Sequence, residues 1–171
     1  MDSFTAFLSI GSNKGAKKLN LEQAIHALDQ HPLIAVSQIS RFYKTRPQNY
    51  ADQDWFVNAA LKIQTRAEGP FELLRILKKI ESSLDQDGKE FRFGPRKIDL
   101  DIVYFENWVL KTDILELPHP RMHERCFVLK PIYDIGPDTV HPVFKLKTHE
   151  LLKTIEHEKD QEVISLDPKE D

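Results

Sequence analysis

The sequence predicts an α+β fold in which four strands and two helices follow in the order β-α-β-β-α-β. Four segments alternate apolar and polar residues with the two-residue period of a strand, and two segments between them repeat apolar residues at helical spacing. Proline and glycine separate most of these segments, as expected where a chain turns. The length of 171 residues is close to the roughly 150 of a typical domain, which favours one domain over residues 1–171.

The first strand, the first helix and the second strand are predicted in turn. Residues 4–10 alternate as a strand, and residues 11–13 form the turn that ends it. Residues 20–28 carry apolar side chains three and four positions apart, which is the stripe of a helix with one buried face. Residues 33–45 are rich in β-branched and aromatic side chains and predict the second strand, which ends before Pro47.

The third strand, the second helix and the fourth strand complete the pattern. Residues 55–65 alternate as a strand, in which the odd-numbered positions from 55 to 63 are apolar and can face a core, whereas Phe56 and Asn58 lie on the opposite face. Gly69 and a proline then open a helix over residues 70–84. Residues 98–105 form the fourth strand.

This order matches the ferredoxin-like split motif, a four-stranded antiparallel sheet with both helices on one face and the other face free. Beyond it, residues 108–110 favour a short strand, and residues 124–133 and 148–155 favour short helices that wrap the core. Residues 158–171 are rich in charge and predict a loosely packed tail, in which apolar residues at 163–166 favour a short strand.

Composition excludes several classes of protein. The 24 basic and 27 acidic residues give a net charge of −3, which argues against an extended nucleic-acid surface. Cys126 is the single cysteine and cannot form an internal disulfide, so a reducing compartment, the cytoplasm, is expected. Neither a signal peptide nor a run of about 18 apolar residues is present, so no membrane partner is expected. A monomer is the default expectation.

An acidic pair stands out in the fourth strand. Asp99 and Asp101 are two positions apart, so both side chains project from one face, about 7 Å from each other along the strand. Two carboxylates among apolar residues repel each other and lose solvation, and a divalent cation between them offsets both costs. Mg²⁺ suits this position because it binds one or two carboxylates together with substrate phosphates. The alternative is the solvent-facing side of a half-buried strand.

A cationic run precedes the acidic pair. The run consists of Lys89, Arg92, Arg96 and Lys97. Together with the acidic pair it occupies a span of 13 residues, from Lys89 to Asp101 inclusive. Arginine side chains and a divalent metal both neutralise a polyphosphate, so their proximity predicts a polyphosphate site. The alternative is a solvated basic loop that balances the aspartates. The glycine-rich motif of a P-loop kinase is absent.

Aromatic and histidine side chains suggest how a planar ligand is bound. Phe56 and Asn58 share one strand face, and an aromatic ring beside an amide suits a heterocycle. Phe56 and Phe127 are each either a stacking surface for a planar ring or plain core. His119 and His123 are four residues apart, but the prolines at 118 and 120 disfavour a zinc-binding helix. A positively charged or hydrogen-bonding pair near an anion is the expected role.

Four ordered motifs together resemble the 6-hydroxymethyl-7,8-dihydropterin pyrophosphokinase family of folate biosynthesis. They are SIGSNKG at 9–15, QDWFVNAAL at 53–61, GPRKIDLDIV at 94–103 and LPHPRMHERCFVLKPIYDIGP at 117–137. The resemblance implies transfer of the terminal diphosphate of ATP, as one unit, to the hydroxymethyl group of the pterin, with release of AMP. The implied fold is the ferredoxin-like core described above.

The resemblance also implies roles for individual residues. Asp99 and Asp101 would hold two Mg²⁺ ions, and both would act in catalysis with Arg92 and Arg96. The residues implied to contact ATP are Glu81, Arg92, Ile98, His119 and Arg125. The residues implied to contact the pterin are Thr45, Gln48, Phe56, Asn58 and Phe127.

The sequence departs from the family pattern in one loop. Family members commonly carry G-R-x-R after the second helix, whereas residues 84–89 here read LDQDGK. A non-catalytic ferredoxin-like module that binds a small ligand is the alternative from another class, and it would not need the aspartates and arginines together. An ordinary kinase that transfers the γ-phosphate is the closer enzymatic alternative, and only the resemblance separates the two.

Overall fold

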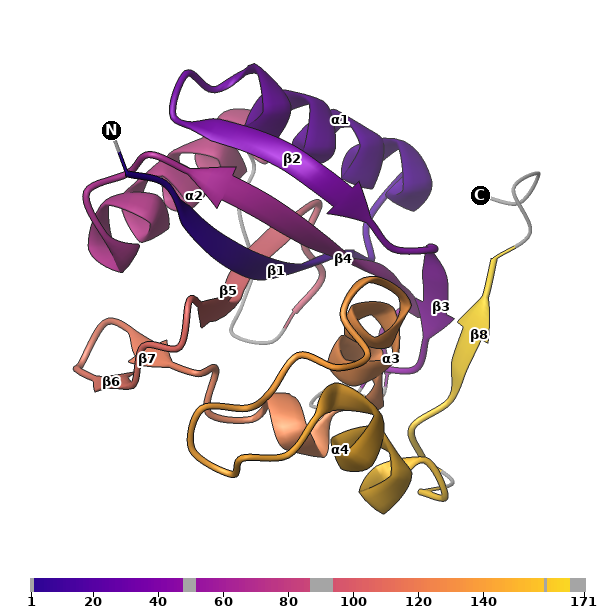
Figure 1. The fold of residues 1–171 in the computed structure, drawn as a ribbon. Helices are drawn as coiled ribbons and strands as arrows, with labels where there is room; N and C mark the ends of the chain where they lie inside the picture. The colour runs from indigo at the N-terminus through magenta and orange to yellow at the C-terminus, as the bar shows by residue number, and fades with distance from the viewer. Residues whose placement is uncertain (1, 48–51, 87–93, 159, 167–171) are drawn as a thin grey trace.

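A six-stranded antiparallel sheet forms the centre of the computed structural model (Figure 1), which describes residues 2–47, 52–86, 94–158 and 160–166. The strands follow the order β5-β1-β4-β3-β8, and β2 pairs with β4 beside β3. Their bounds are β1 Phe4–Ser12, β2 Ile34–Ile39, β3 Tyr43–Thr45, β4 Phe56–Thr65, β5 Asp99–Phe105 and β8 Val163–Ser165. A separate hairpin pairs β6, Leu110–Lys111, with β7, Glu116–Leu117.

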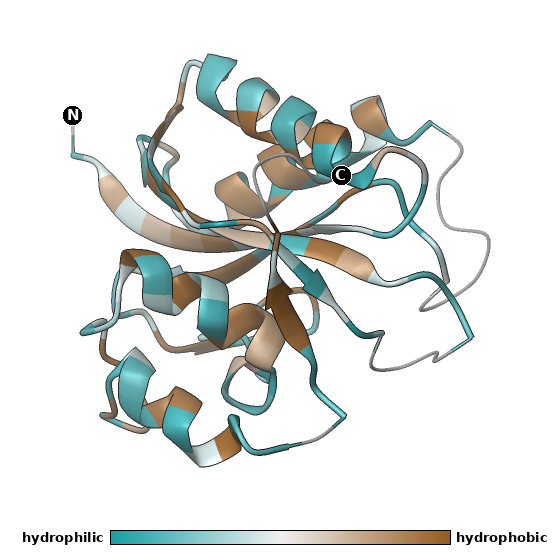
Figure 2. Cartoon of the chain, turned by 90° about the vertical axis from the view of Figure 1, so that its right-hand side faces the viewer, coloured by the Kyte–Doolittle hydropathy of each residue, from teal (hydrophilic) through white to brown (hydrophobic). Residues whose placement is uncertain are grey.

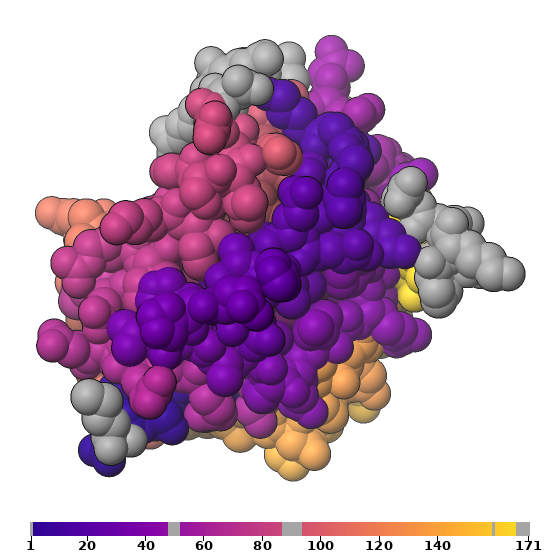
Figure 3. Space-filling model, turned by 90° about the horizontal axis from the view of Figure 1, so that it is seen from above, coloured from indigo at the N-terminus to yellow at the C-terminus, as the bar shows by residue number. Residues whose placement is uncertain are grey.

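Helices cover both faces of the sheet. The helices are α1 Lys17–Gln30, α2 Pro70–Leu84, α3 Cys126–Ile135 and α4 Thr148–Ile155, with a 3₁₀ turn η1 at Met122–Glu124. Figure 3 looks onto α1 and α2, which lie side by side on one face. α3 packs against β4 on the opposite face and carries α4 on its outer side (Figure 1). No helix in the described part of the chain is long and apolar enough to cross a membrane.

Each helical layer buries its own hydrophobic core against the sheet. Under α1 and α2 the core is built around Leu8, Leu61 and Leu100, which are all fully buried. Under α3 the second core contains Leu129 and Ile132. Hydrophilic and hydrophobic residues alternate along α1 and α4 (Figure 2), the pattern of helices that bury one side only. The two cores explain why β1, β4 and β5 are almost continuously buried.

The sheet differs from the predicted four strands for two physical reasons. The predicted second strand is split into β2 and β3, because the Ser40 hydroxyl accepts the backbone N–H of Ala60 (2.8 Å) and the next N–H, of Arg41, donates to Asp134 instead of to the sheet. In addition, β8 returns from the end of the described chain to pair with β3. The expectation of one free face is also wrong, because α3 covers part of that face.

Register places polar residues of three neighbouring strands at one point. In β1 and β4, Gly11 lies opposite Asn58, and on its other side Gly11 lies opposite Asp99 of β5. Two pairs further along, Ser9 lies opposite Asp101. Because alternate residues of a strand share a face, these side chains all project toward the α3 side of the sheet. They form the floor of the pocket described next.

Candidate active site

One pocket on the α3 side of the sheet collects most of the residues that the sequence predicts to act together. Strands β1, β3, β4 and β5 form its floor, and the N-terminal end of α3 forms one wall. The lining residues are Ser9, Gly11, Thr45, Arg46, Gln53, Phe56, Asn58, Arg96, Asp99, Asp101, Arg125 and Phe127. The predicted catalytic and pterin-contacting residues among the described ones all lie in it.

The acidic end of the pocket is formed by the carboxylate pair Asp99 and Asp101. Burial, followed by repulsion from Asp99, raises the pKa of Asp101 to about 7, although Lys78 and Arg125 act in the opposite direction. The described residues contain no group of three or more histidine, cysteine or acidic side chains arranged to hold a metal. Two carboxylates alone suit Mg²⁺, which completes its shell with phosphate oxygens and water.

Arg96 connects the acidic end of the pocket to its aromatic end. Its Nη1 atom lies 3.1 Å from Oδ2 of Asp99, and its Cζ atom lies 5.5 Å from the centre of the Phe56 ring. The backbone around it is fixed by Asn13, since the Arg96 N–H donates to Asn13 Oδ1 (2.9 Å) and the Asn13 N–H donates to the Arg96 carbonyl (3.1 Å). The guanidinium is therefore held where a charged ligand and a planar ligand would meet.

Arg125 supplies a second guanidinium from the wall opposite. It directly precedes α3, and its Cζ atom lies 5.4 Å from the centre of the Phe127 ring. Burial, followed by repulsion from Arg121, lowers the pKa of Arg125, while Asp101 and Asp99 raise it. An arginine remains charged at neutral pH, so both ends of the acidic pair face a cation.

The aromatic end of the pocket is shaped around a buried amide. Asn58 is 5% exposed, and its Nδ2 donates to the Thr45 hydroxyl. A Cβ atom at Gly11 would lie 2.3 Å from Asn58 Oδ1, so only glycine leaves room for the amide. Phe56 lies on the same strand face two residues before Asn58. The combination offers a flat apolar surface beside a group that donates and accepts hydrogen bonds.

Comparisons with known proteins agree with this geometry. The profile of a family described as 7,8-dihydro-6-hydroxymethylpterin-pyrophosphokinase (HPPK) matches residues 7–137. The chain belongs to the HPPK family. A 2-amino-4-hydroxy-6-hydroxymethyldihydropteridine pyrophosphokinase of Bacillus subtilis is 43% identical over 130 residues, which are 76% of this chain and 77% of that protein.

Some relatives of this HPPK-family chain are much longer proteins. The folic acid synthesis protein FOL1 of Dictyostelium discoideum is 40% identical over 85% of this chain, but the match spans only 22% of that protein. A crystal structure of Plasmodium falciparum HPPK-DHPS with pteroate superposes with a TM-score of 0.73 at 14% identity. The superposition covers 90% of this chain and 44% of the Plasmodium chain, and this likeness supports the fold alone.

Three residues that the HPPK resemblance assigns to ATP do not line the pocket. Ile98 is buried in the core under α1 and α2. Glu81 of α2 accepts the N–H of Leu100 (2.7 Å) and pairs with Lys78 (3.4 Å), and burial is the main cause that raises its pKa. His119 lines a second cavity, beside the β6–β7 hairpin, where burial and then Arg125 lower its pKa to about 4.

Two predicted residues, Gln48 and Arg92, lie outside the described residues, as does Lys89. Conversely, Ser9, Gly11, Arg46 and Gln53 line the pocket and were not predicted to. The alternation of the first strand carried a signal for Ser9 and Gly11, because both fall on its less apolar face. Arg46 and Gln53 carried no such signal, since each lies outside a strand.

Proposed function

We propose that this protein transfers the terminal diphosphate of ATP to the hydroxymethyl group of 6-hydroxymethyl-7,8-dihydropterin in folate biosynthesis. One observation carries the proposal: a single pocket contains an acidic pair, the guanidinium groups of Arg96 and Arg125, and an aromatic ring beside a buried amide. The charged end suits a polyphosphate with its metal, and the other end suits a flat heterocycle with a polar edge. Family membership supports the same activity.

Asp99 and Asp101 are the residues that would hold Mg²⁺, and we propose two ions. Bound there, the metal would neutralise charge on the polyphosphate and draw its oxygens toward the reacting centre. The raised pKa of Asp101 supports this assignment. Burial and a neighbouring carboxylate destabilise its charged form, and a bound cation would stabilise that form.

The remaining residues position the two substrates and balance charge. In the reaction the hydroxymethyl oxygen forms a bond to the β-phosphorus, the bond from that phosphorus to the oxygen of the α-phosphate breaks, and the hydroxyl proton passes to solvent. Such transfers depend on alignment and charge stabilisation more than on covalent help from the protein. Arg96 and Arg125 would face the charge on the diphosphate and on the departing AMP.

At the heterocycle end, Phe56 and Phe127 would stack on the pterin, and Asn58, held by Thr45, would bind its polar edge. We assign Gln48 to the same end and Arg92 to the phosphates from the family resemblance. From the same resemblance we propose that Glu81, Ile98 and His119 contact ATP. Ile98 would do so through its backbone, because its side chain is in the core.

Phosphorus NMR of the purified protein with MgATP and the hydroxymethyl-dihydropterin tests the proposal. AMP together with a pterin diphosphate is the expected result. ADP together with a pterin monophosphate would instead show an ordinary kinase. Saturable MgATP binding without turnover would indicate a non-catalytic module that binds a small ligand.

We also propose that the protein works as a monomer in the cytoplasm. Cys126 is buried, and burial is the main cause that raises the pKa of its thiol, which supports a structural and unreactive side chain. Light scattering across a range of protein concentrations tests the monomer, and a mass near twice that of the chain would contradict it.

A further inference from the structure

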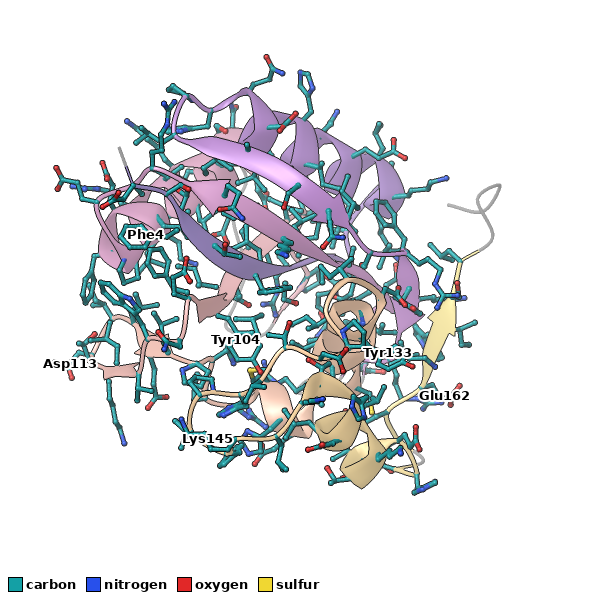
Figure 4. All side chains as sticks on the ribbon, viewed as in Figure 1. Phe4, Tyr104, Asp113, Tyr133, Lys145 and Glu162 are labelled. Atoms are coloured by element: carbon teal, nitrogen blue, oxygen red, sulfur yellow. The ribbon has the colours of Figure 1, made fainter. Side chains whose placement is uncertain are left out.

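The family match ends at residue 137, but a later segment returns to two elements that line the pocket. We call residues 161–166, which include β8, the return segment. It contacts two elements that line the aromatic end of the pocket: β3, with the residue that follows it, and the N-terminal end of α3. Figure 1 shows β8 beside β3 at the edge of the sheet, and Figure 4 labels Glu162 at the start of β8.

The first contact holds β3 and the residue after it. Val163 of the return segment lies opposite Thr45, the partner of the buried amide. The next residue, Arg46, donates its backbone N–H to the Glu162 carbonyl (3.2 Å), and its guanidinium pairs with the Glu162 carboxylate. A strand of only three residues has few hydrogen bonds of its own, so pairing on both edges fixes its position.

The second contact holds the backbone on both sides of Arg125. The Gln161 side chain accepts the N–H of Cys126 (2.8 Å) through Oε1 and donates to the carbonyl of Glu124 (2.9 Å) through Nε2. One amide therefore satisfies two backbone groups where η1 meets α3. Phe127 follows Cys126 directly, so the same amide holds the backbone next to the Phe127 ring.

Gln161 and Glu162 are neighbours in sequence, so the two walls are joined through one peptide bond. Val163 adds to the link because it packs against the core under α3. The acidic floor at Asp99 and Asp101 belongs to β5, at the far edge of the sheet order from β8. The return segment therefore contacts the elements of the aromatic end of the pocket and lies far from the strand of the acidic end.

We propose that the return segment sets the spacing of the pterin-binding walls, with Gln161 and Glu162 as positioning residues. This inference rests on the proposed function. Loosening the segment lowers affinity for the pterin, because Thr45 and Phe127 lose their common support. Affinity for MgATP changes less.

The test uses the full chain with Gln161→Ala and Glu162→Gln, and with Gln64→Ala as a matched control. Gln64 also makes a side-chain amide hydrogen bond, to the Thr5 hydroxyl (2.8 Å), but at the far end of β1 and β4. Titration with oxidised 6-hydroxymethylpterin, followed by its fluorescence, measures the pterin dissociation constant. Titration with a non-hydrolysable MgATP analogue and the thermal midpoint are measured on the same samples.

Gln161→Ala is expected to weaken pterin binding about tenfold, because both hydrogen bonds that hold the backbone around Arg125 are lost, and Glu162→Gln about threefold. The analogue constant should change by less than about twofold in both. Gln161→Glu keeps the acceptor for the Cys126 N–H but loses the donor to the Glu124 carbonyl and places a carboxylate beside Glu158, so it should recover little of the loss. The Gln64→Ala control should bind like the wild type.

Wild-type pterin affinity in both Gln161→Ala and Glu162→Gln would overturn the positioning role, even if their thermal midpoints fall. Equal weakening of pterin and analogue would overturn it too. The binding titrations also separate the two proposals. A wild-type chain that binds the pterin without forming its diphosphate contradicts the proposed function and still tests the return segment, whereas a chain that binds no pterin contradicts both.

Discussion

Arg96 Nη1 lies 3.1 Å from Asp99 Oδ2, so the end of the basic loop is tied to the first residue of the acidic strand. Both side chains are largely buried, at 13% and 21% exposure, which gives the pair more weight than a surface ion pair. The pair also fixes where the guanidinium meets the Phe56 ring. The centre of the proposed reaction lies at this junction between charge and aromatic surface.

Replacing Arg96 by alanine is expected to lower kcat on the order of 10²-fold, because one fixed cation facing the transferred diphosphate is lost. Steady-state kinetics with AMP detection measures the effect. Arg66→Ala is the control, since Arg66 is exposed and its side chain bonds only to the carbonyl of Pro32 among the contacts described for it. A kcat within about threefold of wild type in Arg96→Ala would remove its catalytic assignment.

Asp101→Asn is expected to reduce turnover on the order of 10³-fold and also to raise the thermal midpoint of metal-free protein at pH 8. The pKa of Asp101 is raised from 3.8 to about 7, so its contribution to stability is present below pH 4 and is lost as pH rises through 7. Asparagine does not ionise, so the variant does not lose this stability as pH rises. The increase in thermal midpoint over the wild type should therefore be smaller at pH 5 than at pH 8. Scanning calorimetry in EDTA measures it, and near-normal kinetics would contradict the metal assignment.

Gly11→Ala is expected to raise the KM for the pterin about tenfold or more, with a smaller change for ATP. The new methyl group would overlap Asn58 Oδ1 and displace the amide from Thr45. Gly69→Ala is the matched control, because its Cβ would meet only Trp108, at 4.0 Å. An unchanged KM for the pterin in Gly11→Ala would show that Asn58 does not contact that substrate.

His141 should make the protein less stable as pH falls below 6.5. It is 2% exposed, and its Nδ1 accepts the N–H groups of Val143 and Phe144, so the folded state favours the neutral ring. Burial, followed by His123, lowers its pKa from 6.5 to about 4. The unfolded chain therefore binds the proton first, and the free energy of unfolding should fall by roughly 2–3 kcal/mol between pH 6.5 and 4.

Urea unfolding at several pH values compares the wild type with His141→Gln. The glutamine variant starts from a lower stability because packing changes, but its curve should be flatter between pH 6.5 and 4. His119 contributes a slope of the same sign in both proteins, since its pKa is also lowered to about 4. Parallel curves would assign the pH dependence to groups other than His141.

Much of the pocket could be predicted because alternation along a strand is a local property. Phe56 and Asn58 share a face whatever the strand pairs with, and so do Asp99 and Asp101. Proline and glycine at 69–70 likewise opened the second helix where expected, and the helix over residues 148–155 was predicted with the observed bounds. These signals need only neighbouring residues.

The sequence by itself therefore determined the order of the elements and which side chains share a face, since both follow from backbone geometry over a few residues. The tertiary structure alone decided that Gly11 lies between Asn58 and Asp99, that Ser40 interrupts the second strand, and that β8 returns to β3. Each of these depends on hydrogen bonds between residues far apart in the chain, and no local pattern specifies the partner of a strand edge. The placement of His119 in a second cavity has the same origin.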